Sequence, residues 1–324
     1  MAALDEVHSL LPAQDPASEQ LLTPEGLSRH AFEAMGTTVS LLLPSDRMAE
    51  ARRIERLVAI WEATCTRFDP ASELSQLNAG DGQPRLISEL LFNVLLTAQR
   101  AAKATDGLFD PTLLRSLESI GYDRDFAALA SGQPASPWVG SVPPTGGWRE
   151  LTLDQDHRTA RLPPGIGLDL GGLAKGMAVD AVIADLAARQ VEAAAVDAGG
   201  DLAVIGLPPG APAWTVSIDG PDRPRRVSLT SGAMATSSTA RRRWRQGSAL
   251  RHHLIDPRTG LPSTARVWST SVAAPTCTQA EVAAKVAFLL GPTDGTQFLA
   301  GHDLGGLFLL PDGTELQAGR WSTS

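Results

Sequence analysis

Two short segments bring together residue types that could bind and cleave a phosphate compound. In residues 165–176, GIGLDLGGLAKG, an apolar run ends at Asp169, the pair Gly171 and Gly172 follows, and a helix is expected to begin near Lys175. Glycines let backbone N–H groups approach a ligand, and the start of a helix carries partial positive charge that suits phosphate. The pattern is neither GxGxxG nor a Walker A loop, so a tight strand-to-helix turn with a solvated lysine explains it equally well.

The second segment, HHLIDPRTG at residues 252–260, is denser in reactive side chains. His253, Asp256, Arg258 and Thr259 supply an imidazole, a carboxylate, a guanidinium and a hydroxyl, and a proline and a glycine enforce a turn. The turn could merely satisfy its own polar groups, with the carboxylate capping the backbone and the arginine paired to it. Because so many reactive groups exceed the needs of one turn, we favour a functional site.

Other polar segments have an ordinary structural explanation when each is taken alone. Residues 107–112 read as a helix C-cap followed by an N-cap, and residues 72–78 read as a short capped helix. The basic run RRRWR at residues 241–245 is typical of an exposed, solvated loop, although it could attract a polyanion. Glu281 and Lys285 are four residues apart on an expected helix, which is the spacing of an ordinary ion pair.

The elements that must position these residues alternate irregularly along the chain. Helical spacing of apolar residues and short β-rich runs between turn residues are interspersed without strict βαβ alternation. This favours an α+β fold over a doubly wound parallel sheet. We expect helices at residues 50–62, 88–104, 173–189 and 278–290, strands at 32–43, 193–196, 202–205, 214–218, 267–273 and 306–310, and a hairpin at 150–162.

The chain is expected to form a tail followed by one large domain. Residues 1–30 mix Pro, Gln, Ser and acidic residues without sustained periodicity, which predicts a flexible tail, and residues 31–324 then form the domain. The Pro-, Gly- and Ser-rich residues 131–147 predict a surface loop that could act as a lid or mark an internal boundary.

Composition and charge exclude several classes of partner. With 43% hydrophobic and 20% charged residues the chain is globular, and its formal net charge of -8 argues against a broad surface for nucleic acid or acidic membrane. Cys65 and Cys277 lack the spacing of a zinc site. We find no secretory signal and no spanning apolar run, so we expect a cytoplasmic protein without membrane insertion.

The order of the polar segments along the chain is more informative than any one of them. Together they resemble the successive motifs of the ApbE family, the FAD:protein FMN transferases, over about residues 31–310. The resemblance implies mixed or antiparallel sheets with packed helices in an architecture related to the T-fold. It also implies an enzyme that releases AMP from FAD and attaches FMN through a phosphoester to a Ser or Thr of a target flavoprotein. The matching motifs are residues 35–37, 72–78, 106–112, 169–176, 199–201, 235–237 and 253–260.

The resemblance also implies roles for individual residues. Met35 and Phe68 line the flavin side, with Phe68 standing where the family often has tyrosine. His253 acts at the diphosphate either as a base or as a hydrogen-bond donor, and the sequence leaves both open. The implied catalytic residues are His253, Asp256 and Lys175. The implied FAD-binding residues are Met35, Gly36, Phe68, Leu108, Phe109, Asp110, Asp169, Lys175, Thr236, His253 and Leu254.

The chain departs from the family at the expected metal site. The Gly172 carbonyl matches the family's backbone magnesium ligand, but Glu281 and Lys285 stand where the family usually has Asp and, four residues on, Thr or a similar ligand. Glutamate keeps an oxygen ligand, whereas a protonated lysine cannot coordinate Mg²⁺. We hypothesise that the Lys285 ammonium lies near the usual metal position, is held by Glu281, and supplies part of the positive charge.

Three functions stay open at this point. FMN transfer to a protein hydroxyl is favoured. The alternatives are a FAD diphosphatase that yields FMN and AMP, and a non-catalytic FAD-binding protein whose altered metal site has abolished turnover.

Overall fold

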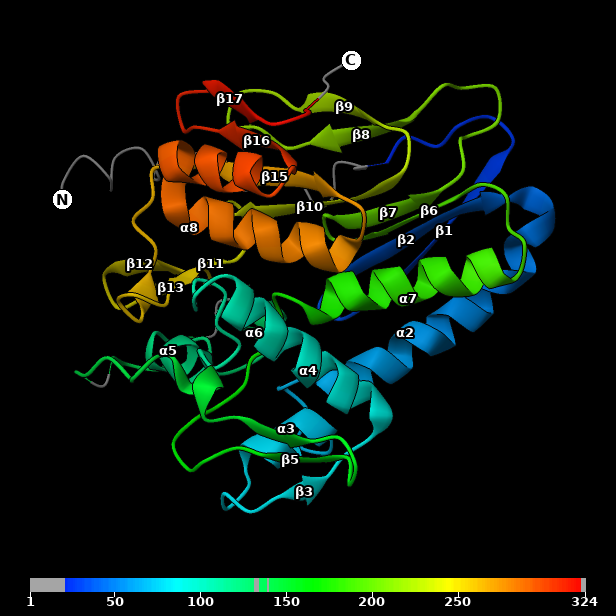
Figure 1. Cartoon of the computed structure of the whole chain (residues 1–324). Helices are drawn as coiled ribbons and strands as arrows, with labels where there is room; N and C mark the ends of the chain where they lie inside the picture. The colour runs from blue at the N-terminus through cyan, green and yellow to red at the C-terminus, as the bar shows by residue number, and fades with distance from the viewer. Residues whose placement is uncertain (1–20, 131–133, 139, 322–324) are drawn as a thin grey trace.

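The centre of the fold is an eight-stranded sheet, seen in a computed structural model that describes residues 21–130, 134–138 and 140–321 (Figure 1). Its strand order is β1-β2-β6-β7-β10-β15-β16-β17, and every neighbouring pair runs antiparallel. The expected α+β fold with antiparallel sheets is therefore confirmed. The strands are β1 (Leu27–Ala34), β2 (Thr37–Pro44), β6 (Ala194–Ala198), β7 (Asp201–Ile205), β10 (Gly232–Ser238), β15 (Ser269–Ala274), β16 (Gly305–Leu309) and β17 (Glu315–Ala318).

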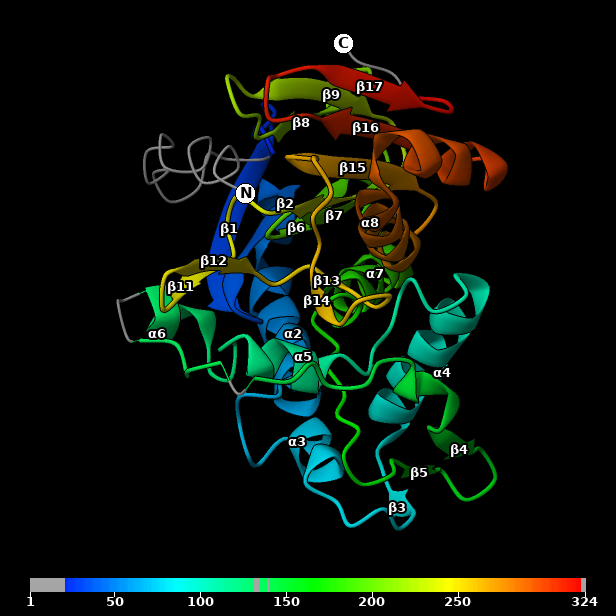
Figure 2. The same ribbon diagram turned by 90° about the vertical axis from the view of Figure 1, so that its left-hand side faces the viewer.

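Two helices, α7 (Ala174–Ala188) and α8 (Cys277–Gly301), pack side by side on one face of this sheet (Figures 1 and 2). The helix expected at residues 278–290 is the first part of α8. It stops there because Gly291 has non-helical backbone angles, with φ 78°, and Pro292 follows it. Proline has no N–H to continue the helical hydrogen bonds, so the second part of α8 starts afresh. No helix of the described residues is long and apolar enough to cross a membrane.

The opposite face of the sheet is covered by the hairpin of β8 (Trp214–Ile218) and β9 (Arg225–Leu229). Successive side chains of a strand point to opposite faces. On β2, Leu41 and Leu43 belong to the core on the helical side, whereas Leu42 packs with the hairpin. Because both faces are covered, the central strands can be apolar at almost every position, which explains why short apolar runs in the sequence predicted them.

A second layer of helices lies below the sheet in Figures 1 and 2, and a hydrophobic core of its own connects it to α7. The Ser72 hydroxyl accepts a hydrogen bond from the backbone N–H of Ser75, which confirms the cap expected for the short helix at residues 72–78. Ser88 caps α4 in the same way. This layer contains α2 (Ala51–Cys65), α3 (Glu73–Asn78), α4 (Glu89–Ala104), β3 (Arg85–Leu86), β4 (Thr152–Asp154) and β5 (Thr159–Arg161). The remaining elements are η1 (Ser45–Glu50), α5 (Leu114–Ser119), α6 (Phe126–Ala130), η2 (Gly147–Arg149), β11 (Arg243–Gln246), β12 (Ala249–His252), β13 (Ile255–Asp256) and β14 (Leu261–Pro262).

The strand expected at residues 32–43 is in fact the end of β1 and most of β2, with a two-residue hairpin turn between them. Ala34 pairs with Thr37, and the two residues between them, Met35 and Gly36, have φ of 52° and 67°. Positive φ at both positions is the geometry of a type I′ turn, in which glycine is free of strain. The Met35 N–H donates to Glu62 Oε1 at 2.7 Å, so the turn is fixed to α2.

The tail expected at residues 1–30 is too long, because described residues before position 31 already belong to the fold. Leu21 is 1% exposed and forms a bridge with Val216, and β1 begins at Leu27. The first part of β1 was not predicted because an edge strand buries few side chains and so has no clear apolar pattern. Only the first and last residues of β1 are buried. Residues 1–20 lie outside the described residues.

The described parts of the loop at residues 131–147 are tied to neighbouring segments. The Ser136 carbonyl accepts a hydrogen bond from Gln246, and the Gly146 N–H donates to Asp110 at 2.8 Å. Residues 131–133 and 139 lie outside the described residues. A role as a lid or an internal boundary stays a prediction.

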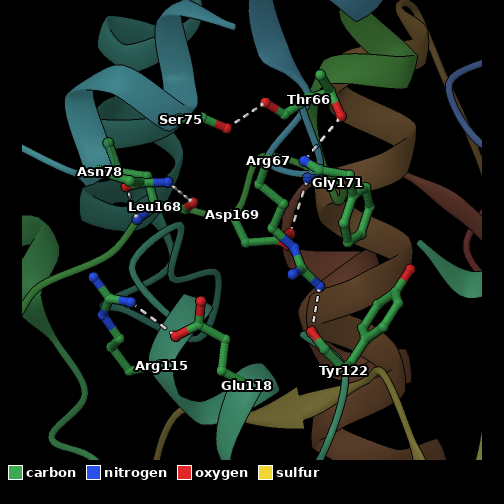
Figure 3. Close-up of polar contacts among 11 residues, drawn as sticks. Thr66, Arg67, Ser75, Asn78, Arg115, Glu118, Tyr122, Leu168, Asp169 and Gly171 are labelled. Atoms are coloured by element: carbon green, nitrogen blue, oxygen red, sulfur yellow. Dashed lines mark hydrogen bonds and ion pairs between the residues drawn. The ribbon is translucent and has the colours of Figure 1, made fainter. Parts of the chain in front are cut away.

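One side chain joins α3 to the segment that leads into Asp169 (Figure 3). Asn78 Nδ2 donates to the Leu168 carbonyl at 2.9 Å, and the Leu168 N–H donates to Asn78 Oδ1 at 2.7 Å. Since Leu168 is fully buried, both of its backbone groups depend on this amide.

Replacing Asn78 by alanine should therefore lower the free energy of unfolding by about 2–3 kcal/mol, because two buried backbone groups lose their partner. Urea denaturation followed by circular dichroism measures the change. Asn93→Ala, at an exposed position of α4, is the matched control and should stay within about 0.5 kcal/mol of the wild type. A similar result for the two variants would contradict this account.

Candidate active site

One cavity of about 340 Å³ gathers segments that are far apart in the sequence. It is lined by the turn between β1 and β2, the residues after α2, the start of α7, strand β10 and α8. Most of the residues implied by the sequence meet here. They are Met35, Gly36, Phe68, Leu108, Asp110, Asp169, Gly172, Lys175, Thr236, His253, Leu254, Glu281 and Lys285.

Asp169 at the cavity wall is paired with a buried arginine (Figure 3). Arg67 Nε donates to Asp169 Oδ2 at 2.6 Å, and a second guanidinium nitrogen donates to the Tyr122 carbonyl at 2.8 Å. The guanidinium carbon lies 4.2 Å from the ring centre of Phe68 and 4.6 Å from that of Tyr122. Arg67 therefore fixes the carboxylate and stacks between the two aromatic rings.

The charges around Asp169 keep it ionised. Burial alone would raise the pKa of this carboxyl, but the positive charges of Arg67 and Lys285 and the N–H of Gly171 together hold its pKa below the usual range. The side chain of Arg67 is only 5% exposed, so the ion pair is shielded from solvent.

Lys175 is enclosed by two carboxylates from different elements. Its ammonium donates to Asp201 on β7 and to Glu281 Oε1 on α8 at 2.8 Å, and Glu281 Oε2 accepts the N–H of Gly176 at 2.8 Å. Burial would lower the pKa of Lys175, but the two carboxylates raise it above its usual value. Burial and the charge of Glu281 raise the pKa of Asp201. Glu281 thus holds Lys175, and the expectation that it holds Lys285 is wrong.

The Lys285 ammonium lies directly against Gly172. A side chain at Gly172 would collide with Lys285 Nζ, and the same nitrogen is 5.5 Å from the ring centre of Phe109. Among the described residues Lys285 has no hydrogen bond or ion pair. Burial lowers its pKa, while the nearby charges of Asp169 and Glu281 act in the opposite direction.

The residues at the expected metal position do not fit magnesium. Both oxygens of Glu281 are bonded to other groups, and an ammonium lies where the second side-chain ligand was expected. Across the part of the chain that the structure describes, no three His, Cys, Asp or Glu side chains are grouped to hold a metal ion.

His253 lines the cavity, and one of its ring nitrogens contacts a backbone carbonyl. Its backbone N–H donates to the Arg242 carbonyl at 3.3 Å, and Nδ1 lies 3.4 Å from the same oxygen. A carbonyl can only accept, so in this contact Nδ1 carries the hydrogen and Nε2 keeps its lone pair. Burial, followed by the charges of Arg242 and Lys285, lowers the pKa of His253 well below its usual value, which makes the ring neutral at physiological pH.

Two implied residues do not line the cavity. Asp256 accepts three hydrogen bonds from the Arg258 guanidinium and one from the Arg258 N–H, and Arg258 also donates to the Leu289 carbonyl at 3.0 Å. Asp256 therefore stabilises its own turn, and Arg258 docks that turn on α8, which is the ordinary structural explanation. Phe109 is 2% exposed in the core. Both were placed at FAD because their neighbours in the motifs do face the cavity.

A model of the ApbE family matches residues 35–308. The chain belongs to the ApbE family. It is 30% identical over 273 residues to the FAD:protein FMN transferase of Treponema pallidum, which covers 74% of this chain and 71% of that protein. It is 27% identical over 232 residues to the FAD:protein FMN transferase of Chlamydia muridarum, covering 70% of each. The crystal structure of the ApbE protein from Thermotoga maritima superimposes with a TM-score of 0.80 at 26% identity, over 90% of this chain and 97% of that one.

Several residues of this ApbE-family site escaped the sequence analysis. Arg67 precedes Phe68 in no recognisable pattern, and Glu62 looked like an ordinary residue of a helix. Arg241 and Arg242 line the cavity from a loop, as expected for the run at 241–245, and Arg241 is exposed. Arg243, Trp244 and Arg245 instead belong to strand β11, so the expected loop is wrong for these three. The signal that could have revealed the strand is Trp244, a large apolar residue between arginines as in a half-buried strand, and it is buried.

We expect Arg67→Ala to lower the free energy of unfolding by about 3–5 kcal/mol, because it leaves the buried Asp169 carboxylate unpaired. Arg115→Ala is the matched control, since Arg115 forms a half-exposed pair with Glu118 at 2.8 Å (Figure 3) and should cost below about 1 kcal/mol. Urea denaturation at pH 7 measures both. The pair's contribution is fully present above the unfolded pKa of Asp169 and is lost as the pH falls through its lower folded pKa. Equal losses in the two variants would refute the assigned role of Arg67.

The lowered pKa of His253 can be observed directly. In protein labelled with ¹³C-histidine, one of the six histidine ring signals should keep its neutral chemical shift as the pH falls from 8 to below 6.5. The spectrum of His253→Asn identifies that signal by its absence. A titration midpoint at or above 6.5 for His253 would show that burial and the neighbouring cations do not control it.

Proposed function

We infer that this chain transfers FMN from FAD to a hydroxyl group of a target protein and releases AMP. The observation that carries the inference is a cavity in which a neutral histidine lies beside two cations, Arg242 and Lys285, whose side chains make no hydrogen bond or ion pair among the described residues. Such cations suit a diphosphate, and the relatives of 27–30% identity are named FAD:protein FMN transferases.

The reaction is a displacement at the phosphorus of the FMN half of FAD. The hydroxyl oxygen of a Ser or Thr in the target protein forms a bond to this phosphorus. The bond from the phosphorus to the bridging oxygen breaks, and AMP leaves with that oxygen. The hydroxyl proton must pass to a base, and the charge on the phosphate oxygens must be offset.

His253 supplies the base. Its Nε2 keeps the lone pair because Nδ1 faces the Arg242 carbonyl, and its low pKa keeps the ring unprotonated. The sequence left a second role open, that of a hydrogen-bond donor to phosphate. The unprotonated Nε2 favours the base.

The other lining residues hold FAD. The ring of Phe68 is 37% exposed and rests on Arg67, so its free face can stack on the flavin. Thr236 is fixed on β10 by a 2.7 Å hydrogen bond to Ser271. Lys175, which was expected to be catalytic, acts by neutralising Asp201 and Glu281 beneath the ligand.

A hydrolase or a passive FAD-binding protein would use the same cavity. In a diphosphatase, water would replace the protein hydroxyl as the attacking group. We favour transfer because the similar proteins are named transferases. The acceptor protein and the cytoplasmic location expected from the sequence stay predictions.

Incubation with FAD and candidate acceptor flavoproteins distinguishes these functions. The acceptor should gain the mass of FMN less one water at a Ser or Thr, and its Ser/Thr→Ala variant should gain nothing. Release of only free FMN and AMP with every acceptor would indicate a diphosphatase, and unchanged FAD would indicate a binding protein. Either result contradicts the proposal.

His253→Asn should lower kcat for transfer by about 10²–10⁴-fold, the usual contribution of a general base, while the Kd for FAD stays within a few-fold. His302→Asn is the control, because His302 is exposed at the end of α8 and, among the described residues, its ring forms a hydrogen bond only to the Phe298 carbonyl. A loss in both variants, or in neither, would remove His253 from the reaction.

A further inference from the structure

Lysine is rare in this chain and is concentrated at the cavity. The sequence has three lysines among 28 basic residues, and two of them, Lys175 and Lys285, line the cavity. Lys175 is fully engaged with carboxylates, whereas Lys285 makes no hydrogen bond or ion pair among the described residues. The ammonium lies over the ring of Phe109, 5.5 Å from the ring centre, and Phe109 is buried in the core. Lys285 is thus a positive charge held ready for a ligand.

The carboxylates around Lys285 are already paired with protein cations. Arg67 forms an ion pair with Asp169, and Lys175 forms ion pairs with Asp201 and Glu281. A divalent cation at this position would therefore have to compete with these cations for the carboxylates.

The Lys285 ammonium also occupies the space beside Gly172. The Lys285 ammonium is so close to Gly172 that no side chain would fit between them. Mg²⁺ requires six oxygen ligands at about 2.0–2.1 Å in octahedral geometry, and an ammonium offers none. Lysine does bind phosphate as a point charge, and its N–H groups donate to phosphate oxygens.

We propose that Lys285 is a catalytic residue that takes the place of a metal ion, so that this chain cleaves the FAD diphosphate without magnesium bound between Gly172 and Glu281. The ammonium contacts the diphosphate oxygens and offsets the charge that develops on the departing AMP. The proposal rests on the inferred FMN transfer and names the cation of that same site.

Metal dependence of turnover is the first test. After EDTA treatment the wild-type protein should transfer FMN from FAD, or release it in the absence of an acceptor, at a rate within twofold of the rate in Mg²⁺. Turnover that appears only in Mg²⁺ would overturn the proposal. No turnover under any condition would refute FMN transfer itself, and the metal question is then decided by binding.

Metal binding is measured without FAD, by electron paramagnetic resonance of added Mn²⁺. Wild-type protein should leave the free Mn²⁺ signal unchanged at concentrations where one tight site would remove it. Uptake of one equivalent that Mg²⁺ displaces, and that Glu281→Gln abolishes, would show that the site holds a metal and that Lys285 does not replace it.

Substitution of Lys285 tests whether its ammonium contributes to FAD binding and turnover. In EDTA, Lys285→Met should weaken FAD binding by about ten- to a hundredfold, as the loss of a charged hydrogen bond predicts, and should lower kcat as well. Lys285→Arg should retain more of both. Lys103→Met, at an exposed position of α4, is the matched control and should match the wild type. Thermal denaturation of each variant verifies folding, and full activity of a folded Lys285→Met protein in EDTA would overturn the proposal.

Discussion

The buried contact of Lys175 with Asp201 and Glu281 is the interaction on which the site depends. It joins the start of α7, the first residue of β7 and the first part of α8. Burying these charges costs several kcal/mol of desolvation each unless they are paired, so the three elements are stable only when they meet in this arrangement. Gly176 permits the meeting, because a side chain there would press against the backbone of Cys277 and the carboxylate of Glu281. The two helices can thus cross closely beside the cavity.

The sequence predicted those parts of the fold that local chemistry determines. The helix at residues 88–104 and the strand at 214–218 have strong apolar periodicity and clear ends, and both were found within a residue. Strand β10 was missed because its sequence, GAMATSS, is small and weakly apolar, and it is a strand only because β7 and β15 pair with it on either side. The residues of β10 alone do not reveal pairing with strands so distant along the chain.

In the site, too, residues in local motifs were predicted and residues brought in by distant contacts were not. Asp169 and His253 were found because they lie in ordered motifs, but Arg67 and Arg242 reach the cavity through folding and have no motif. The pair expected between Glu281 and Lys285 failed for an energetic reason. An i,i+4 pair on a helix contributes about 0.2–0.5 kcal/mol, whereas Glu281 in the fold makes two buried hydrogen bonds to α7. These tertiary contacts therefore determine where the Glu281 side chain points.

The cations that lower the pKa of His253, Arg242 and Lys285, also line the cavity. An anionic ligand that neutralised them would therefore raise the pKa of the ring when it is bound.

The break in α8 has an effect beyond the helix itself. A continuous helix consumes its carbonyls in its own hydrogen bonds, but the last four carbonyls of a helical segment have no partner within it. The break at Gly291 places Leu289 among these, and its carbonyl accepts the bond from Arg258. Arg258 in turn holds Asp256, three residues after His253, the proposed base. The two residues that stop the helix, a glycine and a proline more than thirty positions downstream, thereby help to aim His253.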